Sequence, residues 1–263
     1  MIKIIVCMKQ VPGTNKVALD PVTGNMMRDG TRGKLNPFDL FAVEEALRLR
    51  ELYGGQVTVL SMGPPQAESS LKEALYMGAD EAYLVSDRAL GGSDVLATSK
   101  ALSEAVKAIG IPDLILCGKQ TTDGDTAQVG PEMAEMLGIP HVSNATALAD
   151  AGEGAMLVTT TLERSECTYR IKLPFLVSVE KDMNMPRLPS FRRMKALSSY
   201  RVNVLSLADL QDKDPKHYGT NGSATGVERV FAPEHNQERS FFQGTSREAA
   251  EALCELLAKE KII

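Results

Sequence analysis

One loop of this chain combines residue types that suit a nucleotide. It reads GKQTTDGDTAQVGP over residues 118–131 and follows an apolar run at 113–117. Gly118 and Gly124 permit tight turns and the close approach of a ligand to the backbone. Asp123 is a poor neighbour for phosphate because like charges repel, and it fits a hydroxyl-bearing group such as ribose. The pattern indicates a site for a phosphorylated nucleoside.

The end of this loop is also predicted to begin a helix. Asp125 stands at the N-cap position with Gln128 three residues on, a capping-box analogue. The backbone N–H groups around Thr126 and Ala127 would then face outward at a positive helix end, where phosphate binds well. An ordinary helix cap beside a polar loop explains the same residues without a ligand.

Familiar catalytic and phosphate-binding motifs are absent. The sequence has no P-loop, no GxGxxG after a strand, and no serine triad or paired carboxylates. Cys7 and Cys117 end two apolar runs and are predicted to be core residues. Lys9 is either a solvated lysine or a phosphate partner. The four cysteines and three histidines lack metal-ligand spacing, so no metal site is expected.

Apolar runs and helical periods alternate through the first 140 residues. Strands are predicted at 2–7, 56–61, 82–86 and 113–117, and helices at 38–53, 67–77, 94–109 and 126–137. Asn36 before Pro37 is the predicted cap of the first helix, and Ser93 that of the third. This alternation predicts βαβ units and a doubly wound, mainly parallel sheet with helices on both faces.

Beyond residue 142 this rhythm changes. Residues 155–180 alternate apolar and polar and predict antiparallel additions to the sheet edge, with one last buried strand at 175–180. Residues 183–195 show no period, and 211–244 are polar and predicted to bury little surface. A closing helix at 246–259 has Thr245 and Glu248 as a capping box. We therefore expect a core at 1–190 and an extension at 191–263.

Composition excludes several classes of protein. The net charge of −5 gives no basic surface for nucleic acid or an anionic membrane, and tryptophan is absent. No apolar stretch is long enough for a signal peptide or a membrane span. We expect a cytoplasmic protein that uses neither a nucleic acid nor a membrane.

Several predicted loops should meet at one edge. In an open parallel sheet, ligands bind beyond the carboxyl ends of the strands, where the strand order reverses. Residues 8–12, 62–64 and 118–125 leave such ends, and 36–39 open the first helix beside them. This convergence is the strongest indication of a site that patterning provides.

At these residues the chain resembles the β (small) subunit of electron-transfer flavoproteins. The resemblance covers nearly the whole chain, and it lies in the order of six segments more than in any single one. The segments are IKIIVCMKQVP, LNPFDLFAVEEALRL, SMGPP, ALYMGAD, CGKQTTDGDTAQVGP and LPFLVSVEKDMNMPR. The resemblance implies a core of the adenine-nucleotide α-hydrolase type and a heterodimer with a larger α subunit whose mobile domain carries FAD.

The resemblance also implies a cofactor site. Family cores bind AMP or, in electron-bifurcating members, a second FAD whose ADP half uses the same position. Matched by motif, the site residues here are Cys7, Lys9, Asn36, Pro37, Phe38, Asp39, Met62, Gly118, Lys119, Gln120, Thr121, Thr122, Asp123, Gly124, Asp125, Thr126, Ala127, Gln128 and Val129.

Two segments resemble the bifurcating members more closely. They are MKQVPGTNKVALDPVTGNMMRDG and DGDTAQVGP. That type implies NADH as electron donor. One electron passes to ferredoxin or flavodoxin, and the other passes through the α-subunit FAD to a flavin-dependent dehydrogenase. Acyl-CoA, enoyl-CoA, caffeyl-CoA and lactate dehydrogenases remain open as partners.

The family also has a recognition loop that inserts an apolar side chain into the dehydrogenase. It corresponds here to LPSFRRMK, with Leu188 or Phe191 as the anchor. A linker residue folded back on the core is the alternative. The loop is shorter than the family pattern, and Ser165 stands where members often carry a glutamate after Arg164. The C-terminal arm is expected to pack on the α subunit.

Two other classes use a related architecture. A regulatory nucleotide-binding module should show a glycine-rich loop ending in Gly-Ser or Gly-Thr after its last strands. An adenylate-forming enzyme should show Ser-Gly-Gly or His-x-Gly-His. The chain has no Ser-Gly-Gly and no His-x-Gly-His, and no glycine-rich loop of this kind directly follows the strand predicted at 175–180.

Overall fold

The fold is known from a computed structural model that describes residues 1–13, 18–19, 26–27, 33–226, 228, 239 and 241–263. The chain divides after Glu228 into two compact units. The first holds the sheet and the candidate site, and the second holds helix α7 (Ser246–Lys259). Parts of the 8–30 segment and of the polar 211–244 stretch lie outside the described residues.

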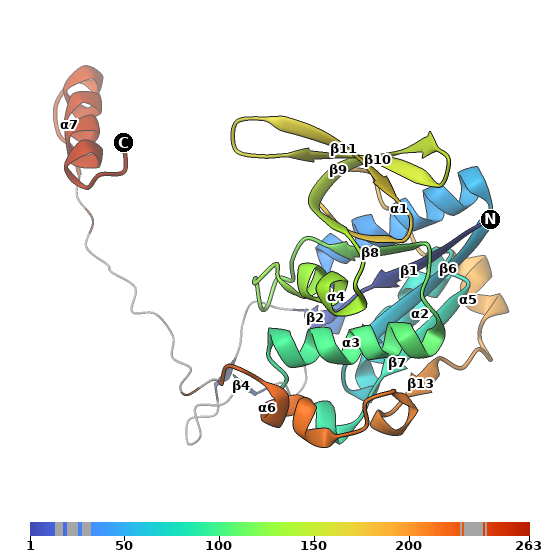
Figure 1. The fold of residues 1–263 in the computed structure, drawn as a ribbon. Coiled ribbons are helices and arrows are strands. Elements are labelled where there is room, and N and C mark those ends of the chain that lie inside the picture. Colours follow the sequence, from blue (N-terminus) through green and yellow to red (C-terminus); the bar gives the residue numbers. More distant parts are fainter. Residues whose placement is uncertain (14–17, 20–25, 28–32, 227, 229–238, 240) are drawn as a thin grey trace. The chain divides into compact units, whose positions relative to one another are not determined.

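A nine-stranded sheet forms the centre of the first unit (Figure 1). Its strands follow the order β11-β10-β9-β12-β8-β1-β6-β7-β13. They are β1 (Ile2–Cys7), β6 (Gly55–Met62), β7 (Glu81–Val85), β8 (Leu114–Gly118), β9 (His141–Gly152), β10 (Ala155–Thr161), β11 (Glu166–Lys172), β12 (Phe175–Val179) and β13 (Asn203–Leu205). Along the sheet, every neighbouring pair from β9 to β13 (β9-β12-β8-β1-β6-β7-β13) is parallel. The two remaining pairs, β9 with β10 and β10 with β11, are antiparallel. The predicted parallel sheet with antiparallel edge additions is confirmed.

Short ladders and helices complete the described elements. The ladders are β2 (Gln10–Pro12) with β5 (Gly33–Leu35), and β3 (Ala18–Leu19) with β4 (Met26–Met27). The helices of the first unit are α1 (Pro37–Tyr53), α2 (Glu68–Met77), α3 (Val95–Ile109), α4 (Val129–Leu137), α5 (Phe191–Ala196) and α6 (Gly219–Gly222). Single 3-10 turns span Pro65–Ala67, Arg88–Leu90, Leu207–Asp209 and Pro215–His217.

Helices cover both faces of the sheet. Residues of α1 and α2 share one buried cluster with Ile4, Val6 and Val57, whereas α3 and α4 share another with Ile5, Cys7 and Leu60. Neighbouring residues of β1 therefore enter opposite clusters, because side chains alternate along a strand. The doubly wound arrangement is confirmed.

The strand order reverses beside β1. From β1 the chain moves outward through β6 to β7, and it then returns to the other side of β1 with β8 and continues to β12. The crossover helices α1 and α2 consequently lie on one face, and α3 and α4 on the other. The carboxyl ends of β1 and β8 are thus a topological switch point, where open α/β sheets bind ligands.

Two predicted helix starts are wrong. Asp94, not Ser93, caps α3, since its Oδ1 accepts from the Ala97 N–H at 3.0 Å, while Ser93 Oγ donates to Leu90 O. Helix α4 begins at Val129 rather than residue 126. Asp125 and Ala127 have φ values of 54° and 55°, which a right-handed helix cannot contain.

The segment after β12 is more ordered than its sequence indicates. Residues 191–196 form α5, capped by Ser190, although this stretch has no helical period. β13 extends the sheet beside β7. Tyr218 is completely buried against the α3 side of the core, and its hydroxyl donates to Asp212 O at 2.7 Å. The first unit therefore runs well past residue 190, and residues 211–226 bury more surface than expected.

Helix α7 has the predicted limits and cap. Glu248 Oε2 accepts from the Thr245 N–H at 2.7 Å, and Thr245 Oγ1 accepts from the Glu248 N–H at 3.4 Å. This reciprocal pair is a capping box, and it satisfies donors that the first helical turn leaves free. None of the residues of α7 is buried.

Truncation of Tyr218 should destabilise the first unit. We expect Tyr218→Ala to lower the free energy of unfolding by about 3–5 kcal/mol, the usual cost of an aromatic cavity. Urea unfolding measures this change. Leu253→Ala on exposed α7 is the matched control and should cost less than about 1 kcal/mol. Equal effects of the two substitutions would contradict a core role for residues 211–226.

Candidate functional site

The predicted site residues meet at the switch point. Cys7 and Cys117 are register partners in the last part of β1 and β8. Gly118 ends β8, Lys9 follows β1, and the start of α1 packs beside β8. Met62 ends β6 on the other side of β1 and is half-buried. The structure thus brings together four stretches that are far apart in the sequence.

Asp39 joins the two central strand ends. Its Oδ2 accepts from the Lys9 backbone N–H at 2.7 Å, and its Oδ1 accepts from the Gly118 N–H at 3.1 Å. The side chain is buried and points into the fold from the first turn of α1. One carboxylate therefore fixes the exits of β1 and β8 relative to the helix.

Asn36 makes the second half of this junction. Its Nδ2 donates to Gln120 O at 2.9 Å, and its Oδ1 accepts from the Thr122 N–H at 3.3 Å. Its backbone N–H donates to Lys9 O at 2.9 Å. The Asn36 side chain therefore makes no cap bond to α1, although Asn36 is the N-cap residue. It sets the path of the loop that follows β8.

Burial shapes the protonation of this junction. It raises the pKa of Asp39 to about 7, although hydrogen bonds from Lys9, Asn36 and Gly118 favour the carboxylate. Burial, followed by the nearby Asp39, raises the pKa of Cys7 to about 12, and burial also raises that of Cys117. These thiols are therefore protonated and unreactive at neutral pH.

Gly118 is held where only glycine fits. A Cβ at this position would lie 2.5 Å from Asp39 Oδ1 and 2.7 Å from Phe38 backbone carbon. Contacts this short force the backbone apart, so a side chain at Gly118 would open the junction. The sequence predicts that a ligand approaches this glycine closely, whereas in the structure α1 does so.

The outer part of the loop keeps polar groups available. Residues 122–128 are exposed, and within the described residues no hydrogen bond uses the backbone N–H groups of Thr126, Ala127 or Gln128. Ala127 has a positive φ, and Gln128 is right-handed. Successive residues of opposite hand turn their N–H groups toward a common point, which suits an anion. The expected capping box is wrong, because the Asp125 side chain accepts from Gln120 Nε2.

Two ion pairs border this loop. Lys9 Nζ lies 2.8 Å from Asp123 Oδ1, and Lys119 Nζ lies 2.7 Å from Glu180 Oε1. Desolvation alone would raise the pKa of Asp123. The hydrogen bond and the charge of Lys9 together outweigh it, so the pKa of Asp123 lies below its ordinary value. Lys9 thus compensates a carboxylate that would otherwise repel phosphate.

Sequence reasoning missed two residues of this edge. Glu180 follows β12 directly, so the strand-end rule was sufficient to find it. Gln10 donates through Nε2 to Gln66 O and Ser69 Oγ, contacts that no local pattern indicates. Leu188 and Phe191 do not join the edge, since their segment bonds to Glu44 of α1 and Tyr76 of α2.

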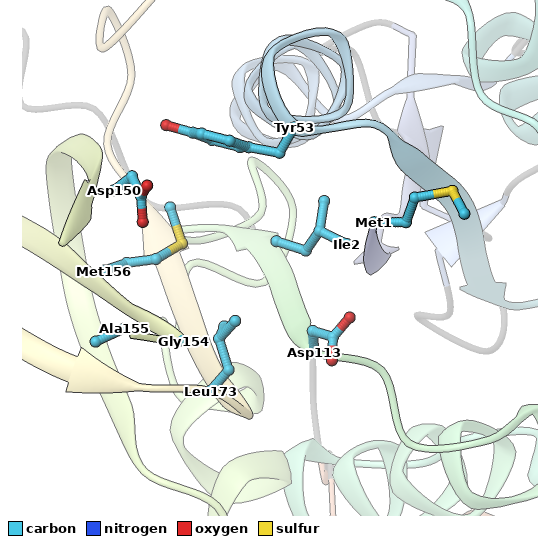
Figure 2. A pocket seen from close by; sticks show the side chains of 9 residues that line it. All are labelled: Met1, Ile2, Tyr53, Asp113, Asp150, Gly154, Ala155, Met156 and Leu173. Carbon is cyan, nitrogen blue, oxygen red and sulfur yellow. The ribbon is translucent and has the colours of Figure 1, made fainter. Parts of the chain in front are cut away.

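A separate hollow of about 240 Å³ lies at the opposite end of the sheet (Figure 2). Figure 2 shows Tyr53, Asp150, Met156 and Leu173 around it, together with Met1 and Ile2. Asp113 accepts from the Lys3 N–H and precedes β8. The amino ends of the parallel strands are not where such sheets bind nucleotides, so the edge at Asp39 is the candidate site.

The fold and edge define a doubly wound α/β protein with loops gathered at a switch point. Residues 23–210 match the electron transfer flavoprotein domain. The chain belongs to the electron transfer flavoprotein family, as the sequence resemblance implied. No helix in the described parts of the chain has the length and apolar character needed to cross a membrane.

Relatives share the whole length of the chain. "Electron transfer flavoprotein subunit beta" of Thermoanaerobacterium thermosaccharolyticum is 43% identical over 261 residues, covering 99% of each chain. "Caffeyl-CoA reductase-Etf complex subunit CarD" of Acetobacterium woodii is 40% identical over 99% of this chain and 100% of its own. "Acryloyl-CoA reductase electron transfer subunit gamma" of Anaerotignum propionicum is 38% identical over the same shares.

Asp39 makes part of the stability depend on pH. In the folded chain it keeps its proton up to about pH 7, whereas the unfolded chain releases it near 3.8. Its contribution is therefore complete below about pH 4 and is lost as the pH rises through 7. The measurement is the difference in the free energy of unfolding between the wild type and Asp39→Asn, obtained by urea titration at several pH values. We expect this difference to fall as the pH rises from about 4 through 7.

Asp209→Asn is the control for the direction of this pH dependence. Hydrogen bonds from Ser206 lower the pKa of Asp209, so the same difference should rise as the pH increases through the acidic range. A flat profile for Asp39→Asn would show that the buried carboxyl does not titrate near neutral pH.

Proposed function

We propose that this chain is the nucleotide-binding β subunit of an electron-transfer flavoprotein and that its switch-point edge holds FAD. The observation that carries the proposal is the loop at 118–128, which Asn36 and Asp39 fix and whose outer backbone donors bond to none of the described residues. An α subunit with a second FAD completes the heterodimer, and the C-terminal arm packs on it. We place this complex in the cytoplasm.

The residues present fit the phosphorylated half of such a cofactor. Backbone N–H groups of residues 126–128 and the amino end of α4 supply donors for phosphate oxygens. Asp123 accepts from a ribose hydroxyl, with Lys9 balancing its charge. The flavin, when bound, supplies the redox chemistry, and the protein holds and orients it.

Electron bifurcation is the finer form of the proposal. NADH would deliver an electron pair, one electron going to ferredoxin or flavodoxin and the other through the α-subunit FAD to a flavin-dependent dehydrogenase. The segments at 8–30 and 123–131 support it, as do relatives named for reductase complexes. Acyl-CoA, enoyl-CoA, caffeyl-CoA and lactate dehydrogenases are the candidate acceptors.

Two alternatives use the same pocket differently. AMP in place of FAD would make the site structural, because the adenylate half of FAD and AMP present the same groups to the loop. A regulatory module without redox chemistry would bind an adenine nucleotide alone. The family membership of the chain favours the electron-transfer forms.

Nucleotide content decides between these forms. We expect the heterodimer, purified after co-expression with its α subunit, to release two FAD molecules per pair on acid extraction. One FAD with one AMP would support simple electron transfer. The Asp123→Ala variant should lose only the β-site nucleotide on dialysis, since the carboxylate for the ribose is removed while the Asn36 and Asp39 junction stays.

Arg170→Ala is the matched control for this substitution. It also breaks an exposed ion pair, which joins β11 to Glu153 in the turn between β9 and β10, and it should leave nucleotide content unchanged. A heterodimer without nucleotide would refute all redox forms of the proposal. Unchanged retention in Asp123→Ala would remove Asp123 from the site.

Docking to the dehydrogenase forms a second, independent prediction. Leu188 and Phe191 are 86% and 65% exposed, as an anchor for a partner pocket requires. We expect Phe191→Ala and Leu188→Ala to raise the apparent KM for the dehydrogenase about tenfold each. Purified acyl-CoA, enoyl-CoA, caffeyl-CoA and lactate dehydrogenases are assayed in turn to select the partner that accepts electrons.

NADH oxidation with an artificial dye acceptor serves as the control. It needs the flavins but no docked dehydrogenase, so it should be unchanged in both variants. Parallel loss of dye reduction and dehydrogenase transfer would indicate a folding defect rather than a docking role.

A further inference from the structure

Residues 212–225 cross helix α3 as a strap that is bonded to this helix at both ends. At one end the Asp212 N–H donates to Oε2 of Glu104, a buried residue of α3, at 3.0 Å. At the other end the Thr225 N–H donates to Oδ2 of Asp94, the N-cap residue of α3, at 2.8 Å. Figure 1 shows the short helix α6 of this strap beside α3. These bonds fix the strap along one side of α3.

The strap is also packed closely on itself and on the core. Tyr218 is fully buried in the cluster that holds residues of α3, and its backbone O accepts from the Gly222 N–H at 2.9 Å. A Cβ at Gly222 would lie 2.2 Å from the backbone carbon of His217, so only glycine fits there. Packing therefore determines the backbone of this part of the strap.

A hollow of about 360 Å³ lies between the strap and helices α3 and α4. Leu96 and Ala97 of α3 and Met136 of α4 form the apolar part of its lining, and Leu96 is 42% exposed. Small-molecule sites typically have volumes of about 300–1,000 Å³. Among the described residues, its lining shares no member with the loop at 118–128 or with the hollow of Figure 2. It is therefore a separate candidate site.

The ionisable groups that line this hollow are all basic. Lys100, Lys216 and His217 belong to its lining together with the amide of Asn221. Within the described part of the chain, no carboxylate belongs to the lining. Such a wall repels a cation and attracts an anion, and the apolar part of the lining favours a ligand with an aliphatic chain.

One carboxylate holds two of these basic groups. Asp212 Oδ2 lies 2.8 Å from His217 Nδ1 and 3.1 Å from Lys100 Nζ. The hydrogen bond from His217 is the main cause that lowers the pKa of Asp212 to about 2, so this carboxylate stays ionised at neutral pH. Because Nδ1 of His217 is bonded to Asp212, Nε2 is the ring nitrogen left for a ligand.

The side chains of Lys216 and Asn221 are available to a ligand. Neither bonds or forms an ion pair with any described residue, although the Lys216 backbone N–H donates to Asp214 Oδ1 at 3.0 Å. An ammonium and a primary amide offer several N–H donors, which suit the oxygens of a carboxylate or phosphate. Because both residues lie on the packed strap, an anion can meet them without reorganising the backbone.

We propose that the hollow under the strap binds an amphipathic anion, a carboxylate or phosphate head group on a short aliphatic chain. Lys216 and Asn221 donate to the head group, and Lys100 and His217 add positive charge around it. Leu96 contacts the chain together with the other apolar lining residues. The site lies apart from the proposed nucleotide edge and does not depend on what that edge binds.

The test compares ligands that share one chain and differ in the head group. The complete heterodimer is titrated with octanoate, octyl phosphate, octan-1-ol and octylammonium, and binding is followed by saturation-transfer NMR. We expect at least one of the two anions to bind with a dissociation constant of about 1 mM, and the alcohol and the amine to bind at least about tenfold more weakly. The tighter of the two anions identifies the head group. Equal binding of all four probes, or binding of none, would overturn the inference.

Substitutions place the binding in this hollow. Lys216→Met should raise the dissociation constant of the preferred anion about tenfold, since it removes the charged donor and keeps the length of the side chain. Leu96→Glu should abolish binding, because it puts a like charge beside the ligand at an exposed position where the fold tolerates it.

Lys213→Met is the matched control, because Lys213 is an exposed lysine of the same strap that does not line the hollow. It should leave the dissociation constant unchanged. An equal effect of Lys213→Met and Lys216→Met would reduce the binding to a general charge effect and contradict a site. Unchanged binding in both Lys216→Met and Leu96→Glu would place the anion elsewhere on the heterodimer. Nucleotide content, which reports the proposed function separately, should be the same in every variant.

Discussion

A buried carboxylate and a buried amide at the start of α1 constrain everything at the carboxyl edge of the sheet. Asp39 accepts from backbone donors that follow β1 and end β8, and Asn36 bonds the loop beyond β8 on both sides of its amide. A buried polar group without partners is costly, so these side chains allow only arrangements that keep their hydrogen bonds. The loop at 118–128 owes its path to this requirement.

Helix α1 links the two surfaces that the proposed function needs. Its first turn holds the candidate nucleotide edge through Asp39. Further along, Glu44 and Glu51 bind Arg187, in the segment that carries Leu188 and Phe191. One rigid element thus fixes where a cofactor would lie and where a partner would dock. Electron transfer depends on distance, and a single helix supporting both ends is a simple way to keep that distance constant.

On the proposed function, the edge would take AMP and FAD for the same physical reason. The groups that the chain offers are backbone donors and the Asp123 carboxylate with its Lys9 partner, and they suit phosphate and ribose. Both ligands share these parts. Selection between them must then come from groups that meet the remainder of FAD, which an α subunit would help to supply. The protonated thiols of Cys7 and Cys117 add no reactive group to the edge.

Local sequence determined the strands, most helices, the capping box of α7 and the loops that converge at the switch point, because periodicity and turn residues act over short distances. Residue order also carried the family resemblance. Only the tertiary structure decided that α4 starts at Val129 and that Tyr218 is buried. It also decided that Asp39 accepts from the Gly118 N–H and that Arg187 pairs with Glu44. Each of these depends on partners far away in the chain, such as Gly118 for Asp39 and Glu44 for Arg187. A local pattern cannot contain such partners, since it records only what neighbours in sequence favour.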